Sequence, residues 1–180
     1  MKNPVDGTEY ATRSGDFRWT DQGYLVTSQG FRVQGTVIDT SVTPATSAVG
    51  DIKLGTPPPV TPATTPPTNT QRQSVTIDRS GNVVEFYSDG TSATTNQVLL
   101  QNFNDPSALV KEGANLYSWL VAAGPIGAAS GTSALDATAN APGTNGLGNI
   151  QSGTLELSNV DLTDQFTNLI TTQRSFQAGS

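Results

Sequence analysis

The chain has 180 residues, 34% of them hydrophobic and 13% charged, and its net charge of −6 makes it a poor partner for nucleic acid or anionic membrane surfaces. It has no cysteine, which excludes disulfides, and no histidine, which removes the commonest general base and metal ligand. Its 18 glycines and 11 prolines favour short strands, and no apolar run is long enough to span a membrane. We predict one mainly β domain over residues 1–180: an antiparallel domain of short hairpins with one short helical turn, a C-terminal α-helix and no cofactor.

The first 35 residues predict a β-meander with a side-chain period of two. Asp6 and Gly7 are typical of a hairpin turn between two short β-compatible segments. From residue 16 onward, apolar residues alternate along the chain. Turns at residues 21–23 (Asp-Gln-Gly) and 28–30 (Ser-Gln-Gly) separate the short strands.

The aromatic residues of this meander allow two interpretations. Trp19, Tyr24 and Phe31 could form a platform for a sugar ring, which would make the domain a carbohydrate-binding β-module. At alternating positions of a meander, however, aromatic side chains more often belong to the core face, and we favour that interpretation. Asp16 and Asp21 could form a catalytic carboxylate pair, but they are more typical of solvated turns. We therefore do not expect an enzyme.

Residues 40–72 form an insert that is rich in proline and threonine. Six of the 11 prolines fall between residues 56 and 68. Proline lacks the N–H that a central strand donates to its neighbour, so this tract cannot join a central sheet. We predict an extended, polyproline-like excursion between two strands. A docking ligand for an aromatic groove is the less favoured alternative.

A second hairpin unit follows the insert. Residues 75–87 place a turn at 78–82 (Asp-Arg-Ser-Gly-Asn), residues 88–90 make the next turn, and residues 97–103 predict a further strand. The turn at 78–82 slightly resembles a calcium loop, but it lacks the alternating acidic ligands and the closing glutamate of such a loop. A hairpin turn is the better interpretation, because Asp, Asn and Gly dominate turns.

The elements after this unit are short and irregular. Asp105 and the proline that follows it predict the start of a helical turn, which Gly113 ends. Residues 115–121 predict a strand. Residues 122–149, rich in Gly, Ala and Ser, predict a long surface loop. A last short strand is predicted at residues 154–157.

Residues 161–177 predict the start of a terminal helix. Asp161 is a suitable N-cap, and Asp164 adds negative charge where the helix dipole favours it. Because the helix stops at the end of the chain, we expect the chain to be a fragment whose missing part completes a helical seam.

Four apolar residues fall mostly on one face of this helix: Phe166, Leu169, Ile170 and Phe176. The face either packs on the domain's own sheet or needs a partner surface. Both can hold if Phe166 and Leu169 pack inside while Phe176 extends outward.

Three segments of the chain resemble the bacterial flagellar hook and rod family. Residues 158–178, SNVDLTDQFTNLITTQRSFQA, are similar to its C-terminal signature, SNVDLxxEFxxMIxxQRxFQANS. Residues 10–35, YATRSGDFRWTDQGYLVTSQGFRVQG, are similar to its YTRxGxFxxDxxGYLVTxxGxxVQG block. Residues 97–117 resemble the hook-type segment between the two. The chain departs from the family in its short, proline-rich centre.

The resemblance implies a structural subunit of the flagellar hook, an exported, torque-transmitting axial tube outside the cytoplasm. Such a subunit assembles with copies of itself and with other flagellar axial proteins into a helical polymer, because heterologous contacts do not close. The distal rod of the basal body is the alternative within the family, and the carbohydrate-binding module is the alternative outside it.

The terminal helix is the candidate assembly interface. Its expected contact residues are Phe166, Leu169, Ile170, Arg174 and Phe176. Arg174 could pair with a carboxylate of a neighbouring subunit. The family's inner helices are missing from the chain, so we expect the isolated chain to be monomeric or weakly associated.

Overall fold

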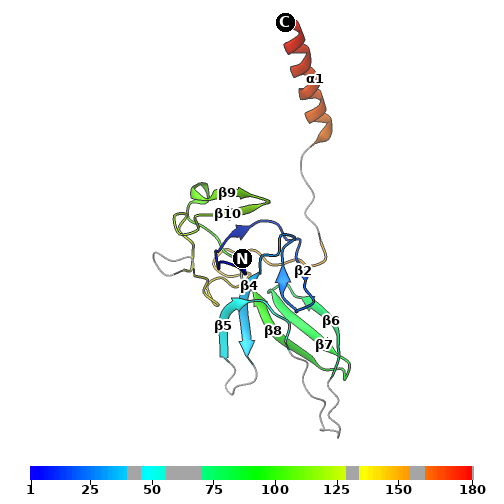
Figure 1. The fold of residues 1–180 in the computed structure, drawn as a ribbon, viewed down its shortest axis with the longest axis vertical. Coiled ribbons are helices and arrows are strands. Elements are labelled where there is room, and N and C mark those ends of the chain that lie inside the picture. The colour runs from blue at the N-terminus through cyan, green and yellow to red at the C-terminus, as the bar shows by residue number, and fades with distance from the viewer. Residues whose placement is uncertain (40–45, 56–69, 129–133, 155–160, 180) are drawn as a thin grey trace.

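The computed structural model describes residues 1–39, 46–55, 70–128, 134–154 and 161–179. These residues form three antiparallel sheets and a C-terminal α-helix (Figure 1). The prediction of a mainly β fold built from short hairpins is therefore confirmed. Within the described ranges, no helix is long and apolar enough to cross a membrane. The described part of residues 1–154 is the β body.

The largest sheet has five strands in the order β5-β4-β8-β7-β6, and all neighbouring strands are antiparallel. Its strands are β4 (Gln34–Asp39), β5 (Thr46–Asp51), β6 (Arg72–Ile77), β7 (Asn82–Tyr87) and β8 (Ser92–Val98). The predicted hairpin at 75–87 is confirmed as β6 and β7. Within the range 40–72, Thr46–Asp51 forms β5 and pairs with β4. The proline tract at 56–68 lies outside the described residues.

The turn between β6 and β7 is held by its own side chains. The Asp78 carboxylate accepts hydrogen bonds from the backbone N–H and from the side-chain amide of Asn82, both at 2.9 Å. Gly81 has a φ of +80°, a left-handed conformation that glycine adopts readily. Asp78 and Asn82 are engaged within the turn, which confirms the hairpin interpretation over a calcium loop.

β8 differs from its prediction. The sequence predicts a strand at residues 97–103, but β8 ends at Val98. The chain leaves the sheet there because the Leu100 N–H donates to the carbonyl oxygen of Asn140, at 2.9 Å, and not to a neighbouring strand. Phe103 then forms an isolated antiparallel bridge with Pro125.

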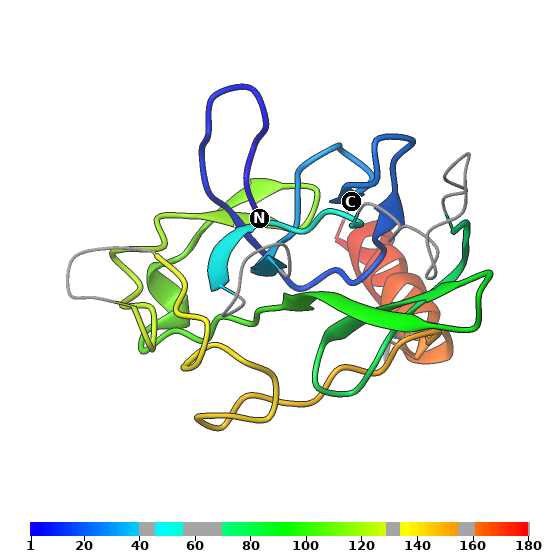
Figure 2. The same cartoon turned by 90° about the horizontal axis from the view of Figure 1, so that it is seen from below.

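The N-terminal meander packs on the large sheet. Its strands β2 (Arg18–Trp19) and β3 (Leu25–Val26) pair, and the predicted turns at 21–23 and 28–30 are confirmed by backbone hydrogen bonds that Gly23 and Gly30 donate. The buried core cluster joins the two parts through Leu25, Val33, Ile52, Val83 and Val98. Figure 2 shows the blue N-terminal part next to the green strands of the large sheet.

The third sheet has the order β1-β10-β9, with β1 (Ala11–Thr12), β9 (Val110–Gly113) and β10 (Leu116–Ser118). The predicted helical turn is confirmed as the 3₁₀ helix η1 (Pro106–Ala108), where the Asp105 carboxylate accepts from the Ser107 N–H at 3.0 Å. The prediction that Gly113 ends this turn is wrong, because the residues up to Gly113 pair with β10. The strand predicted at 115–121 stops at Ser118, since Trp119 has a left-handed φ of 62°.

The described parts of the predicted loop, residues 122–128 and 134–149, contain turns and are attached through Asn140 to the chain that follows β8. The buried Asn140 side chain donates to the Gln101 side-chain oxygen at 3.3 Å, and the Asn140 backbone carbonyl oxygen accepts from the Leu100 N–H at 2.9 Å. Within the loop, the Asn140 Oδ1 accepts from the Asp136 N–H at 2.8 Å. Most of the strand predicted at 154–157 lies outside the described residues.

Candidate functional site

Helix α1 (Leu162–Ala178) begins as the sequence predicts. The Asp161 carboxylate accepts a hydrogen bond from the Thr163 N–H at 2.8 Å, which satisfies one of the free donors of the first turn. Asp164 lies in that first turn, where a negative charge is favoured. The predicted N-cap is therefore confirmed.

Every residue of α1 whose burial is described is exposed to solvent. In Figure 1 the helix stands away from the β body. Its large apolar side chains are mostly in solvent: Leu162 is 67% exposed, Phe166 62%, Leu169 54%, Ile170 51% and Phe176 80%. The possibility that Phe166 and Leu169 pack inside the domain is therefore wrong for this structure, because α1 does not lie against the sheet. Arg174 is exposed on the same helix.

Sequence reasoning missed one member of this apolar face. Leu162 lies four residues before Phe166, so the two side chains fall on the same side of a helix. The i, i+4 spacing was the signal that could have found it. In proteins, most of the stability of a helix comes from the packing of its apolar face, and the described side chains of α1 are all exposed.

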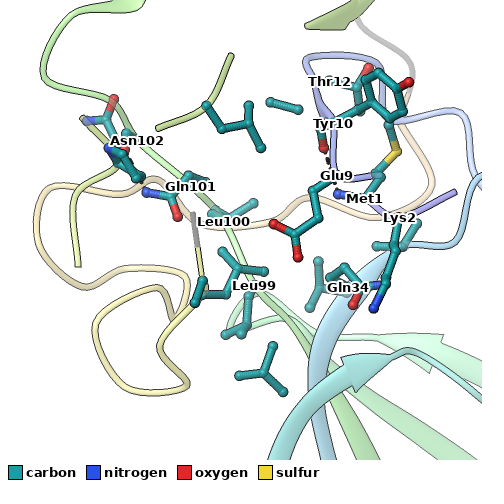
Figure 3. Close-up of a pocket in the computed structure, with 18 of the residues that line it drawn as sticks. Met1, Lys2, Glu9, Tyr10, Thr12, Gln34, Leu99, Leu100, Gln101 and Asn102 are labelled. Carbon is teal, nitrogen blue, oxygen red and sulfur yellow. Dashed lines mark hydrogen bonds between the residues drawn. The ribbon is translucent and has the colours of Figure 1, made fainter. Parts of the chain in front are cut away.

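The second feature is a groove of about 860 Å³ in the β body (Figure 3). It lies between the N-terminal segment, β4 and β5, and the chain that follows β8. Both apolar and polar side chains line it, among them Glu9, Tyr10, Gln34, Leu99, Leu100 and Gln101. In the described ranges, no group of three acidic, histidine or cysteine side chains could hold a metal ion.

Asp51, at the side of this groove, is bound to its neighbours. Its carboxylate forms an ion pair with Arg32 at 2.7 Å and accepts a hydrogen bond from Gln34 at 2.6 Å. Partial burial raises the pKa of Asp51, but the hydrogen bonds from Gln34 and Arg32 outweigh burial and leave this pKa below its usual value. A carboxylate held ionised in this way is a weak general base.

The aromatic residues of the meander are occupied by contacts within the chain. Trp19 is partly buried against the core cluster, which confirms its assignment to the core face. Arg32 lies over the ring of Tyr24 at 4.0 Å from the centroid. The rings of Phe31 and Tyr10 are 5.3 Å apart and tilted by 46°. These side chains do not form a flat, free platform for a sugar.

Asp16 and Asp21, the less favoured candidates for a carboxylate pair, are exposed residues of a loop and a turn. Asp16 accepts a hydrogen bond from the Ser14 hydroxyl and is exposed, as is Asp21. Both carboxylates are therefore in the solvated setting that is typical of Asp in turns and loops.

Known proteins match both the β body and α1. The model of the flagellar hook protein FlgE/F/G D1 domain matches residues 1–85, and that of the flagellar basal body rod FlgEFG protein C-terminal region matches residues 151–180. The chain is 34% identical over 175 residues to the flagellar basal-body rod protein FlgG of Bacillus subtilis, which covers 97% of the chain and 53% of that protein.

Hook proteins match a shorter part. The chain is 41% identical over 104 residues to the flagellar hook protein FlgE of Treponema pallidum, which covers 58% of the chain and 20% of that protein. The chain spans about half the length of its rod relatives: 53% of the Bacillus subtilis FlgG and 52% of the Caulobacter vibrioides FlgG. Because family models match its beginning and its end, and a rod protein aligns over 97% of its length, the chain belongs to the flagellar hook and rod protein family.

Proposed function

We propose that the chain is the β-rich part of a structural subunit of the bacterial flagellar hook, the exported axial tube that transmits torque. One observation carries the proposal: α1 presents a solvent-exposed apolar face, and the family's C-terminal model matches this same part of the chain. An exposed apolar face of this kind indicates an interaction surface. A structural subunit can use such a face to bind neighbouring copies of itself, and this role requires neither a ligand nor a catalytic group.

The proposed assembly interface is the face of α1 with Phe166, Leu169, Ile170, Arg174 and Phe176, extended by Leu162. Its partners are copies of the same protein and other flagellar axial proteins. Contacts between different surfaces of identical subunits do not close, so a helical polymer grows. The isolated chain is monomeric or weakly associated, since its helix supplies only one side of a helical seam.

The distal rod of the basal body is a second candidate. The rod proteins of Bacillus subtilis and Caulobacter vibrioides align over 97% and 98% of the chain, whereas the hook protein of Treponema pallidum aligns over 58%. This coverage is the observation that supports a rod subunit as the second candidate.

Electron microscopy of purified hook–basal bodies, labelled with gold-linked antibodies against the β body, tests both candidates. We expect label on the axial structure, because the proposed subunit is part of its wall. Label along the hook supports a hook subunit, and label confined to the rod supports a rod subunit. Unlabelled hook–basal bodies from cells that express the protein would contradict both.

A further inference from the structure

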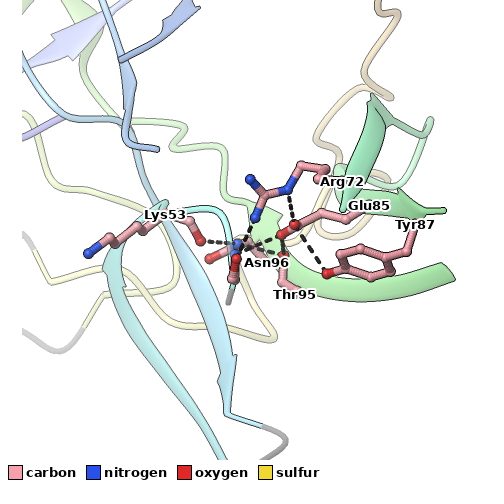
Figure 4. Close-up of polar contacts among 7 residues, drawn as sticks. Lys53, Arg72, Glu85, Tyr87, Thr95 and Asn96 are labelled. Carbon is pink, nitrogen blue, oxygen red and sulfur yellow. Dashed lines mark hydrogen bonds and ion pairs between the residues drawn. The ribbon is translucent and has the colours of Figure 1, made fainter. Parts of the chain in front are cut away.

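Glu85, in β7, is a charged side chain that is fully buried. Removing a carboxylate from water is costly unless it is paired and hydrogen-bonded. Glu85 forms an ion pair with Arg72, and its Oε1 accepts from the Gly55 N–H at 2.8 Å and from the Thr95 hydroxyl at 2.7 Å. The Tyr87 hydroxyl donates to its Oε2 at 3.3 Å. Both carboxylate oxygens are therefore satisfied (Figure 4).

These contacts converge on the two ends of one chain segment, residues 56–69. Gly55 directly precedes that segment; its N–H donates to Glu85 and its carbonyl oxygen accepts from the Arg72 guanidinium. Arg72, the first residue of β6, also donates to Glu85. Gly55 and Arg72 are 17 positions apart in the sequence and in direct contact in space. One carboxylate thus ties both ends of the segment to β7.

Each end also has an anchor of its own. Before the segment, the buried Asn96 amide donates to the Lys53 carbonyl oxygen at 2.7 Å. After it, the Gln71 carbonyl oxygen accepts from the Ser88 N–H at 2.9 Å, and the Gln71 N–H donates to the Ser88 hydroxyl at 3.0 Å. The chain therefore leaves and rejoins the β body at fixed positions.

We propose that Glu85 and Arg72 form a lock that fastens to β7 the chain on either side of residues 56–69, at Gly55 and at Arg72. The lock lets the β body fold and keep its stability whatever sequence connects Gly55 to Thr70. Once the ends of a loop are fixed by contacts outside it, the entropy of closing the loop changes only slowly with loop length. This role does not depend on the flagellar function.

The first test replaces residues 57–68 of the chain with a Gly/Ser linker, at the same length and at twice that length. The lock remains intact in both variants, so the melting temperature measured by circular dichroism should change by no more than about 2 °C. A decrease as large as that caused by breaking the lock would overturn the proposal.

The second test breaks the lock with Glu85→Gln. The new amide turns one acceptor into a donor, and the partly buried Arg72 loses its counter-charge, so we expect the melting temperature to fall by about 10 °C. The matched control is Glu112→Gln, on exposed β9, whose carboxylate accepts only from the Ser118 hydroxyl among the described contacts. That control should change the melting temperature by less than about 2 °C.

A double variant, Glu85→Leu with Arg72→Met, separates the lock from general stability. Apolar residues of similar volume can replace a buried ion pair, so much of the melting temperature should return. The Gly55 amide still lacks its acceptor, and its hydrogen exchange should be about tenfold faster than in the parent chain. Unchanged exchange at Gly55 in a folded double variant would show that Glu85 does not hold this end.

Discussion

Replacing Gly35 with alanine is expected to destabilise the β body by about 3 kcal/mol or more, because the central sheet has no room for a methyl group there. Gly35 lies in β4 and pairs with Val98 on one side and with Gly50 on the other. A Cβ at this position would lie 2.2 Å from the Gln97 carbonyl oxygen and 2.8 Å from two side-chain carbons of Ile52. The first of these atoms belongs to the backbone of β8 and the second to the fully buried core.

Gly50→Ala is the matched control for this substitution. Gly50 is the partner of Gly35 across the β4–β5 pair, and its added Cβ would meet only Val37, at an ordinary 3.6 Å. We expect a change in the free energy of unfolding below about 1 kcal/mol for this variant. Urea unfolding followed by circular dichroism measures both. Equal unfolding midpoints for the two variants would contradict the steric argument.

The parts of the fold that depend on local chemistry could be predicted from the sequence. The Asp78 turn, the Asp105 and Asp161 caps and the meander turns are each encoded within about five residues, the span over which turn and cap signals act. The end of β8 could not be found in this way, because it depends on a hydrogen bond from Leu100 to the distant Asn140.

The Glu85 lock was hidden from the sequence for the same reason. Alternation along β7 places Val83, Glu85 and Tyr87 on one face, and all three are buried. A glutamate at such a position normally indicates a solvent face. Glu85 can be buried because Gly55, 30 positions earlier, and Arg72, 13 positions earlier, donate to its carboxylate. No local sequence pattern links these two residues to β7.

The apolar face of α1 shows the opposite case, in which sequence reasoning found the residues but not their environment. Helical spacing identified Phe166, Leu169 and Ile170 correctly as members of one face. Periodicity says which residues share a face but not what that face contacts. The choice between the domain's own sheet and a partner therefore needed the position of the whole helix.

In a full-length protein that contains this chain, Leu169→Gln with Ile170→Gln is expected to abolish assembly into the axial structure. Burying a Leu or Ile side chain contributes about 1.5–3 kcal/mol, so losing both weakens each subunit contact by at least about 3 kcal/mol, more than 100-fold in affinity. Glutamine keeps a good helix propensity, so the helix itself is preserved. Motility and the yield of hook–basal bodies from complemented deletion cells measure the effect.

The control places the same two glutamines on the other side of α1, as Asn168→Gln with Thr171→Gln. These positions are exposed and lie away from Phe166 around the helix, so assembly should be retained. Both double variants of the isolated chain should keep the unfolding midpoint of the parent, because the residues of α1 are exposed and do not contribute to the core. Both should sediment as monomers. Long polymers of the isolated chain, or normal motility with the Leu169 and Ile170 variant, would show that contacts outside this face of α1 drive assembly.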